Sequence, residues 1–295
     1  MQMLVFGGSG RVGQVMCRAA RAAGWDVLAP AHAECDLAQP GAAAELLLAH
    51  AGAEAVVNCA AISGLEACAD NPLRAHRINA MAPAEMALIC RHTGARFLHL
   101  STDYVLDGRR PGLKAESAKC KPISTYGESK REGEQQILDT RAEALILRVS
   151  WVCGNPERPS FVESTLARAL SGQPLAAIDD KYSLPTHAAD IARALLALIP
   201  RPESGILHLT SGSSEPLSWH SCATLALQEA VRSGALPELP PITRQHLREA
   251  AFFREPRPVH TAMDTTALQS ALGHPLPTAE ATLRRAVQDY LSRRR

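Results

Sequence analysis

The first half of the chain alternates short apolar runs with longer segments of helical periodicity. Apolar runs at residues 3–6, 26–29, 55–58, 96–100 and 144–149 predict strands. Helical patterns cover residues 12–23, 42–50, 72–92 and 126–138, and Pro83 predicts a kink or a break in the third of them. Strands that alternate with helices are typical of a parallel sheet with helices on both faces. The pattern therefore predicts an α/β fold, a Rossmann-like doubly wound parallel sheet.

The pattern changes after residue 152, where prolines cluster, helical stretches become shorter and loops become longer. This change predicts a smaller C-terminal substrate-binding cap. Residues 1–152 are interpreted as a dinucleotide-binding domain, with a return segment near residues 186–209, and residues 153–295 as mainly the cap.

Composition narrows the class of partner. The net charge of +1 gives no reason to expect nucleic acid or an anionic membrane surface as a partner. The chain starts without a basic leader, and its apolar runs are shorter than the roughly 18 residues of a membrane span. The 8 cysteines are scattered without a C-x-x-C pair, which favours buried thiols in a reducing cytoplasm over a zinc site, so no metal is expected.

A glycine turn separates the first strand from the first helix. Gly7, Gly10 and Gly13 form a G-x-x-G-x-x-G pattern. Glycine lets the backbone turn tightly and approach a pyrophosphate, and the helix then presents free N–H groups to the anion. The turn therefore predicts a dinucleotide site, expected for NADPH or NADH. The second strand ends without a clear acid or arginine, so the choice between the two stays open. Arg11 is either a 2′-phosphate ligand or a solvated side chain.

Polar residues also follow the strands whose carboxyl ends would meet at the reacting end of the site. They occur in Asn58-Cys59-Ala60-Ala61, Ser101-Thr102-Asp103-Tyr104 and Ser150-Trp151. Tyr126 and Lys130 begin the next helix and would lie on one face of it. In this hypothesis Tyr126 donates a proton to a ketone that receives hydride. Lys130 and the nicotinamide charge bring the pKa of the phenol toward the working pH, and Thr102 hydrogen-bonds the carbonyl oxygen.

These motifs resemble those of the extended short-chain dehydrogenase/reductases and, more narrowly, of the dTDP-4-dehydrorhamnose reductase family. The matching strings run nearly from end to end, and they are GGSGRVG, NCAAI, RINAMAPAEMA, STDYVLDG, YGESKREGE, RVSWVCG, DDKYSLPTHAADIA and REPRPVHTAMDTTALQ. The resemblance implies reduction of the 4-keto group of dTDP-4-dehydro-L-rhamnose to dTDP-L-rhamnose with NADPH or NADH.

The resemblance also implies site residues, position by position. The catalytic residues would be Thr102, Tyr126 and Lys130. The cofactor would be lined by Gly7, Gly10, Arg11, Val12, Asp36, Leu37, Ala60, Ala61, Asn79, Ser101, Tyr126 and Lys130. The nucleotide-sugar substrate would face Ser63, Leu65, Thr102, Tyr104, Trp151 and Arg257. Four of these residues could instead have a purely structural role, as a helix cap for Asp36, a cap near the kink for Asn79, core packing for Trp151 and a surface charge for Arg257.

The chain departs from the family pattern in two places that affect function. The loop Ser63-Gly64-Leu65-Glu66 differs from the usual T-x-V-D, so a different sugar pocket is expected. Ala189 stands where a metal-bridged dimer of the family would need an acid, which argues against a metal-linked dimer, although a homodimer stays open. Two other functions also stay open, a sugar-nucleotide epimerase of the same superfamily and a non-catalytic NADP-binding regulatory subunit.

Overall fold

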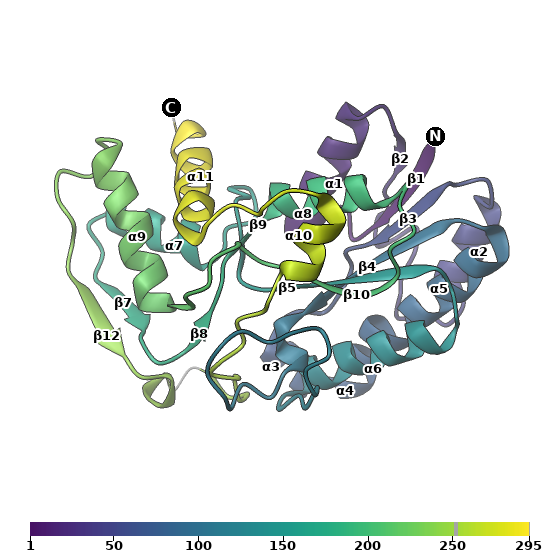
Figure 1. Cartoon of the computed structure of the whole chain (residues 1–295), viewed down its shortest axis with the longest axis horizontal. Helices are drawn as coiled ribbons and strands as arrows, with labels where there is room; N and C mark the ends of the chain where they lie inside the picture. Colours follow the sequence, from purple (N-terminus) through teal and green to yellow (C-terminus); the bar gives the residue numbers. More distant parts are fainter. Residues whose placement is uncertain (251–252, 295) are drawn as a thin grey trace.

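The computed structural model describes residues 1–250 and 253–294, and its centre is a sheet of six parallel strands (Figure 1). The strand order is β10-β5-β4-β3-β1-β2. The strands are β1 (Gln2–Phe6), β2 (Asp26–Leu28), β3 (Ala55–Asn58), β4 (Arg96–Thr102), β5 (Ala144–Val149) and β10 (Gly205–Leu209). The order reverses between β1 and β3, and ligands bind at such a switch point in doubly wound folds.

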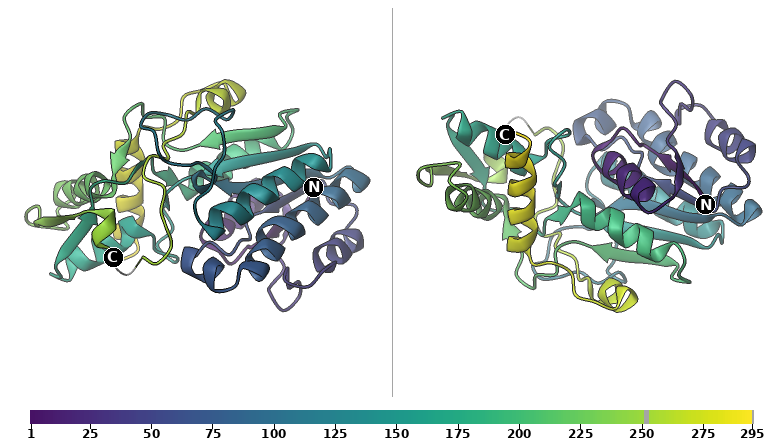
Figure 2. Two further views of the ribbon diagram at one scale, coloured as in Figure 1. Left: turned by 90° about the horizontal axis from the view of Figure 1, so that it is seen from below. Right: turned by 90° about the horizontal axis from the view of Figure 1, so that it is seen from above.

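Helices cover both faces of the sheet (Figure 2). Along β1, Met3 and Val5 point into a core shared with α1 and α8, whereas Leu4 and Phe6 point into a core shared with α2, α5 and α6. This alternation is the strand period of two, and both sets are buried because each face has its own helical layer. The helices are α1 (Arg11–Ala22), α8 (Ala188–Leu198), α2 (Ala42–Ala49), α5 (Ala82–Thr93) and α6 (Thr125–Asp139), with α10 (Thr266–Leu272) beside α8. The doubly wound α/β fold expected from the sequence is confirmed.

The helical pattern over residues 72–92 is broken, as Pro83 predicted. It consists of α4 (Pro72–His76), a π-helical turn η1 (Arg77–Met81) and α5. A proline lacks an N–H and crowds the preceding turn, so the regular bonding cannot continue through it. The π turn holds Asn79, whose fully buried side chain accepts from the N–H of Ile62 and donates to its carbonyl oxygen, both at 2.9 Å. The break therefore fixes the loop that follows β3.

The remaining elements gather beside the sheet and form a smaller body with a core of its own (Figure 1). Its helices are α7 (Phe161–Leu170), α9 (Trp219–Arg232) and α11 (Ala279–Ser292). Its strand pairs are β7 (Leu175–Ile178) with β12 (Ile242–Gln245), β8 (Tyr182–Ser183) with β11 (Leu217–Ser218), and β6 (Val152–Cys153) with β9 (Thr186–His187). The short helical segments are α3 (Leu65–Asp70), η2 (Asp103–Val105) and η3 (Leu247–Glu249). No helix of the described residues has the length and apolarity to span a membrane.

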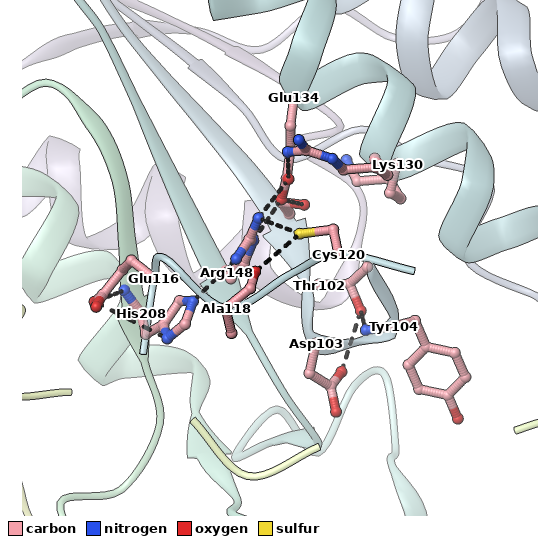
Figure 3. A network of polar contacts seen from close by, with 12 residues as sticks. Thr102, Asp103, Tyr104, Glu116, Ala118, Cys120, Lys130, Glu134, Arg148 and His208 are labelled. Carbon is pink, nitrogen blue, oxygen red and sulfur yellow. Dashed lines mark hydrogen bonds and ion pairs between the residues drawn. The ribbon is translucent and has the colours of Figure 1, made fainter. Parts of the chain in front are cut away.

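A buried ion pair fastens α6 to the sheet (Figure 3). Glu134 of α6 is fully buried, and its carboxylate accepts from Nε and Nη2 of Arg148 on β5, both at 2.7 Å. Ser101 donates to the same carboxylate at 2.6 Å, and Nη1 of Arg148 lies 3.2 Å from Nε2 of His208 on β10. Burial opposes the charge of Glu134, but the hydrogen bonds and charge of Arg148 lower the pKa of this carboxyl group. The pair fixes the position of the helix that carries Tyr126 and Lys130.

Replacing Arg148 by methionine is expected to lower the free energy of unfolding by about 3–5 kcal/mol, because it leaves Glu134 buried and charged without its partner. Urea unfolding measures this loss. The double variant Glu134→Leu with Arg148→Met is expected to recover most of it, since no buried charge remains.

Arg131 supplies a matched control, because it contacts the same carboxylate at 3.1 Å from a side chain that is one-third exposed. Arg131→Met should change the free energy of unfolding by at most about 1 kcal/mol. Equal losses of unfolding free energy in the Arg131 and Arg148 variants would contradict the conclusion that the Glu134–Arg148 pair holds α6 on the sheet.

Candidate active site

The glycine turn forms a tight cradle against the end of β3. Gly7 has φ +75°, and a Cβ atom there would lie 2.6 Å from the backbone nitrogen of Ala60. A Cβ atom at Gly13 would lie 2.0 Å from the carbonyl oxygen of Gly7. Side chains at these two positions would separate β1, α1 and β3, so both glycines are required by close packing. At Gly10 the nearest atom to a Cβ would be the Gly7 oxygen at 3.2 Å, so its open side faces the cleft.

The N-terminus of α1 fits the pyrophosphate of a dinucleotide. Gly10 is the N-cap residue and provides no side-chain cap, so the first N–H groups of a 12-residue helix keep their capacity to bind an anion. A cleft runs from this turn past the ends of β2 and β3. Its lining includes Phe6, Gly7, Ser9, Gly10, Pro30, His32, Cys35, Asp36, Leu37, Cys59, Ala60, Ala61, Ile62 and Ile78. Six of the residues predicted at the cofactor, Gly7, Gly10, Asp36, Leu37, Ala60 and Ala61, therefore lie together.

Other residues predicted at the cofactor have partners within the protein. Arg11 donates to the carbonyl oxygens of Arg158 and Pro159, at 2.8 and 2.9 Å, and so contacts the loop before α7. Ser101 is bonded to Glu134, and Asn79 holds the loop after β3. Val12 packs against the core beside α1. These side chains shape the surroundings of the cleft.

Three residues predicted at the reacting end come together. Thr102, at the end of β4, is 5% exposed and donates to the Asp103 carboxylate at 3.2 Å. Its hydroxyl group also lowers the pKa of Tyr126, at the start of α6, so the two side chains lie close together. The rings of Tyr104 and Tyr126 meet edge to face, with centroids 5.8 Å apart. Ser124 caps α6 by accepting from the N–H of Gly127 at 3.3 Å, so the helix begins where Tyr126 can reach Thr102. The arrangement places the phenolic hydroxyl group of Tyr126 beside the hydroxyl group of Thr102.

The protein alone does not acidify Tyr126, which differs from the expectation drawn from the Tyr126–Lys130 spacing. Burial raises the pKa of Tyr126, and Asp103 raises it further, whereas the neighbouring Thr102 hydroxyl group lowers it. Nζ of Lys130 lies instead 2.9 Å from Nε2 of His99 and 2.7 Å from the carbonyl oxygen of Leu100. Burial lowers the pKa of Lys130 to about 8. The phenol therefore stays protonated, because desolvation raises its pKa by more than a lysine one helical turn away lowers it.

Asp103 and Lys181 occupy the same region, and the sequence analysis assigned no role to either of them. Asp103 is 2% exposed, and its carboxylate accepts from Ser150 at 2.8 Å and from Thr261. Lys181 is fully buried, donates to the Pro258 carbonyl oxygen at 2.6 Å, and lies 4.9 Å from the ring centre of Tyr104. Only 5 lysines occur in the chain, and this scarcity was the available signal for Lys181.

Trp151 begins an aromatic cluster that continues into the cap. Its φ is 42°, a left-handed conformation that costs a non-glycine residue about 1–3 kcal/mol, and its buried indole N–H has no partner among the described residues. Its ring centroid lies 5.9 Å from that of Trp219, which stacks on Phe161 at 5.4 Å. Phe161 and Trp219 also line an adjoining cleft with Phe253. The aromatic faces suit a flat ring that binds beside the reacting end.

Arg257 contacts α3, the short helix that follows the loop after β3. The guanidinium of Arg257 pairs with the Glu66 carboxylate at 3.1 Å and covers the ring of Phe253, 3.4 Å from its centre. Leu65 is 8% exposed at the start of α3, and Ser63 is exposed in the preceding loop. Arg257 therefore already has a carboxylate partner, so the interpretation of it as a plain surface charge is wrong. Its side chain is only 7% exposed.

Within residues 1–250 and 253–294, no group of His, Cys, Asp and Glu side chains is arranged to hold a metal ion. Asp190, next to Ala189, instead accepts from Arg285 at 2.9 Å.

Comparison with known proteins gives relatives that span the whole chain. Residues 1–292 match the family described as RmlD substrate binding domain. The dTDP-4-dehydrorhamnose reductase of Salmonella typhimurium is 30% identical, covering 99% of this chain and 99% of that protein. A probable dTDP-4,6-dihydroxy-2-methyloxan-3-one 4-ketoreductase of Streptomyces antibioticus is 32% identical, with 99% and 96% covered. The crystal structure of dTDP-4-dehydrorhamnose reductase from Bacillus anthracis in complex with NADP has a TM-score of 0.86 at 22% identity, covering 98% of this chain and 99% of that one.

Gly10→Val is expected to weaken NADPH binding at least about tenfold while the protein stays folded, because the side chain would enter the cleft and not the core. Calorimetric titration measures the affinity. Gly52→Val is the control, since no atom lies within 4 Å of a Cβ there, and it should bind NADPH as the wild type does. Equal affinities in the two variants would remove the turn from the cofactor site.

The stability of the protein should depend on pH through Lys130. Its pKa is about 8 when folded, below the usual 10.5, so the unfolded chain binds more protons between these values. The wild type should therefore gain about 3 kcal/mol relative to Lys130→Met as pH rises from 8 to 10.5, and lose it on the way down. Urea unfolding of both proteins across this range tests the sign. A constant difference would mean that Lys130 titrates normally.

Proposed function

The chain belongs to the RmlD substrate binding domain family, and from this membership we propose that it is an NAD(P)H-dependent reductase of a nucleotide-linked 4-keto-6-deoxy sugar. The proposed reaction converts dTDP-4-dehydro-L-rhamnose to dTDP-L-rhamnose. The observation that carries the proposal is that Thr102 and Tyr126 lie close together at the carboxyl end of β4, on the same edge of the parallel sheet as the glycine turn that follows β1 and fits a dinucleotide. The reductase names of the relatives from Salmonella typhimurium and Streptomyces antibioticus support the same class of reaction.

The proposed mechanism needs one proton from the protein. The dinucleotide, when bound, supplies the hydride for the C4 carbon of the sugar. Tyr126 donates its phenolic proton to the C4 oxygen, and Thr102 holds that oxygen by a hydrogen bond. Burial raises the pKa of Tyr126, so the phenol is protonated at neutral pH and carries the proton that the reaction needs. The charge state of the protein thus suits reduction of a ketone.

The proposal divides the chain between two ligands. Residues 1–152, with the return segment near 186–209, would bind the dinucleotide, and residues 153–295 would mainly bind the nucleotide sugar. Tyr104, Trp151, Arg257 and the loop of Ser63 and Leu65 would face the sugar. The base would stack against the aromatic cluster of Phe161 and Trp219, whose faces lie along the cap cleft. The eight free thiols suit the cytoplasm, which we propose as the compartment.

Two observations bear on the identity of the sugar. The relative from Streptomyces antibioticus is named for a different dTDP-linked keto sugar at similar identity. The loop at Ser63 and Leu65 also departs from the family pattern beside the proposed pocket. A reductase of a neighbouring 4-keto sugar is therefore the second candidate, with the same residues in the same roles.

Tyr126→Phe is expected to reduce turnover by several orders of magnitude and to keep the affinity for NADPH, because it removes only the transferable proton. Turnover is measured as NADPH oxidation in two separate assays. One uses dTDP-4-dehydrorhamnose, and the other uses the dTDP-linked keto sugar for which the Streptomyces antibioticus relative is named. Calorimetry measures the NADPH affinity.

Tyr290→Phe is the matched control, since Tyr290 lies on α11 beside Arg294, and it should be as active as the wild type. Equal rates in the Tyr126 and Tyr290 variants would exclude Tyr126 as the acid. NADPH binding without turnover on either sugar would instead favour a regulatory subunit, and conversion without net NADPH oxidation would favour an epimerase.

A further inference from the structure

A buried chain of hydrogen bonds runs beneath the cleft from the loop after β3 to the catalytic helix. Its side chains are Asn58 on β3, His99 on β4 and Lys130 on α6, each at most 1% exposed. Asn58 Oδ1 accepts from the N–H of Ala60 at 2.9 Å, and its Nδ2 lies 3.1 Å from Nδ1 of His99. Nε2 of His99 lies 2.9 Å from Nζ of Lys130, which is 2.7 Å from the carbonyl oxygen of Leu100.

The donor and the acceptor of each hydrogen bond in this series can be assigned, starting from Ala60. The N–H of Ala60 can only donate, so the amide oxygen of Asn58 must face it and the amide NH₂ must face His99. Nδ1 of His99 is then the acceptor. Burial, with the nearby Lys130, holds the pKa of His99 well below its usual range, so the ring is neutral. A neutral ring with an acceptor at Nδ1 carries its proton on Nε2, and that proton points at Nζ of Lys130.

An ammonium group at Lys130 would place its N–H donor opposite the Nε2–H donor of His99. An ammonium has three N–H donors and no acceptor, whereas a neutral amine has a lone pair that can accept from Nε2–H while it donates to Leu100. The other groups near Lys130 do not offset this mismatch. Glu134 favours the charged form, but its carboxylate is already paired with Arg148. Burial raises the pKa of the nearby Cys59 thiol to about 12, so that thiol stays neutral.

We infer that His99 is a positioning residue that favours the unprotonated amine of Lys130, and that Asn58 and the backbone of Ala60 enforce this by fixing the His99 tautomer. Protonation of Lys130 would require the ring of His99 to change tautomer and Asn58 to turn over. That turn would place the Asn58 amide NH₂ against the N–H of Ala60, a residue of the cofactor cleft. The charge of Lys130 and the shape of the cleft floor are thereby linked.

The inference deepens the proposed function, on which it rests only for the role of Tyr126. With Lys130 unprotonated, the site avoids a buried ammonium that has no carboxylate partner. The tautomer and the charge state, in contrast, belong to the folded chain and can be measured without substrate.

The test uses NMR on the full-length protein labelled in its lysine and histidine side chains. The chain has 5 lysines, and Lys130→Met and Lys181→Met assign the two buried ones. Lys181 is the internal control. It is equally buried, and burial also lowers its pKa to about 8, but its Nζ faces the Pro258 oxygen and the Tyr104 ring, with Asp103 nearby. We expect Lys130 to titrate at lower pH than Lys181, and His99 to show the Nε2–H tautomer. An Nδ1–H tautomer, or a Lys130 that titrates at or above the pH of Lys181, overturns the inference.

Asn58→Asp reverses the assignment at nearly constant shape. A carboxylate would accept from both Ala60 and His99, which moves the ring proton to Nδ1 and leaves Nε2 to accept from a Lys130 ammonium. The pKa of Lys130 should rise by about one unit or more together with the change of tautomer. If this variant does not fold, His99→Gln, which can offer a carbonyl oxygen to Lys130, should raise the same pKa. A Lys130 titration unchanged in the folded variant contradicts the inference.

The pH dependence of the proposed reduction separates this inference from the proposed function. In Asn58→Asp, the limb of the kcat profile that reports Lys130 should move up by about one unit or more while the KM for NADPH changes little. A wild-type protein with the expected tautomer but no turnover would leave the inference standing and remove the proposed function. A kcat profile that Asn58→Asp leaves unchanged would contradict the inference and leave the proposed function standing.

Discussion

The ion pair between Glu134 and Arg148 is the interaction on which the site depends. A helix that lies on a parallel sheet is free to slide or rotate unless something directional holds it, and apolar contacts are not directional. Two short hydrogen bonds between a guanidinium and a carboxylate, both at 2.7 Å, define one position and one rotation. Lys130 lies one helical turn before Glu134, and Tyr126 one turn before that. The position of both side chains is therefore set by the Glu134–Arg148 pair.

The same constraint explains which parts of the structure could be predicted from the sequence. Strands such as β1, with every residue from Met3 to Phe6 buried, are visible as apolar runs because both faces are covered. The break near Pro83 could be predicted because a proline inside a helix removes a backbone hydrogen bond and crowds the preceding turn, whatever surrounds it. The glycine turn is visible because its spacing and its place between a strand and a helix are both local features. These predictions needed no knowledge of what lies opposite each residue.

The parts that were missed depend on partners far away in the chain. Glu134 and Arg148 stood in quoted motifs, but their pairing joins α6 to β5 and cannot be derived from spacing. The expectation that Lys130 and the nicotinamide charge acidify Tyr126 was drawn from helical spacing, and this spacing does not show that Nζ of Lys130 points to His99. Nor does a sequence show how completely a side chain is desolvated, and desolvation has the largest effect on the pKa values of both residues.

Contacts between the sheet and the cap differ in how much they can contribute. Arg254 and Asp70 form an ion pair at 3.0 Å, but both side chains are more than half exposed, so solvent screens most of their attraction. Arg257 and Glu66 are better shielded, and the stacking of Arg257 on Phe253 adds an apolar contact. Arg11 adds two hydrogen bonds from the glycine turn to the loop before α7. The strongest cross-contacts therefore lie at the two ends of the proposed ligand path, one beside the cofactor turn and one beside the sugar loop.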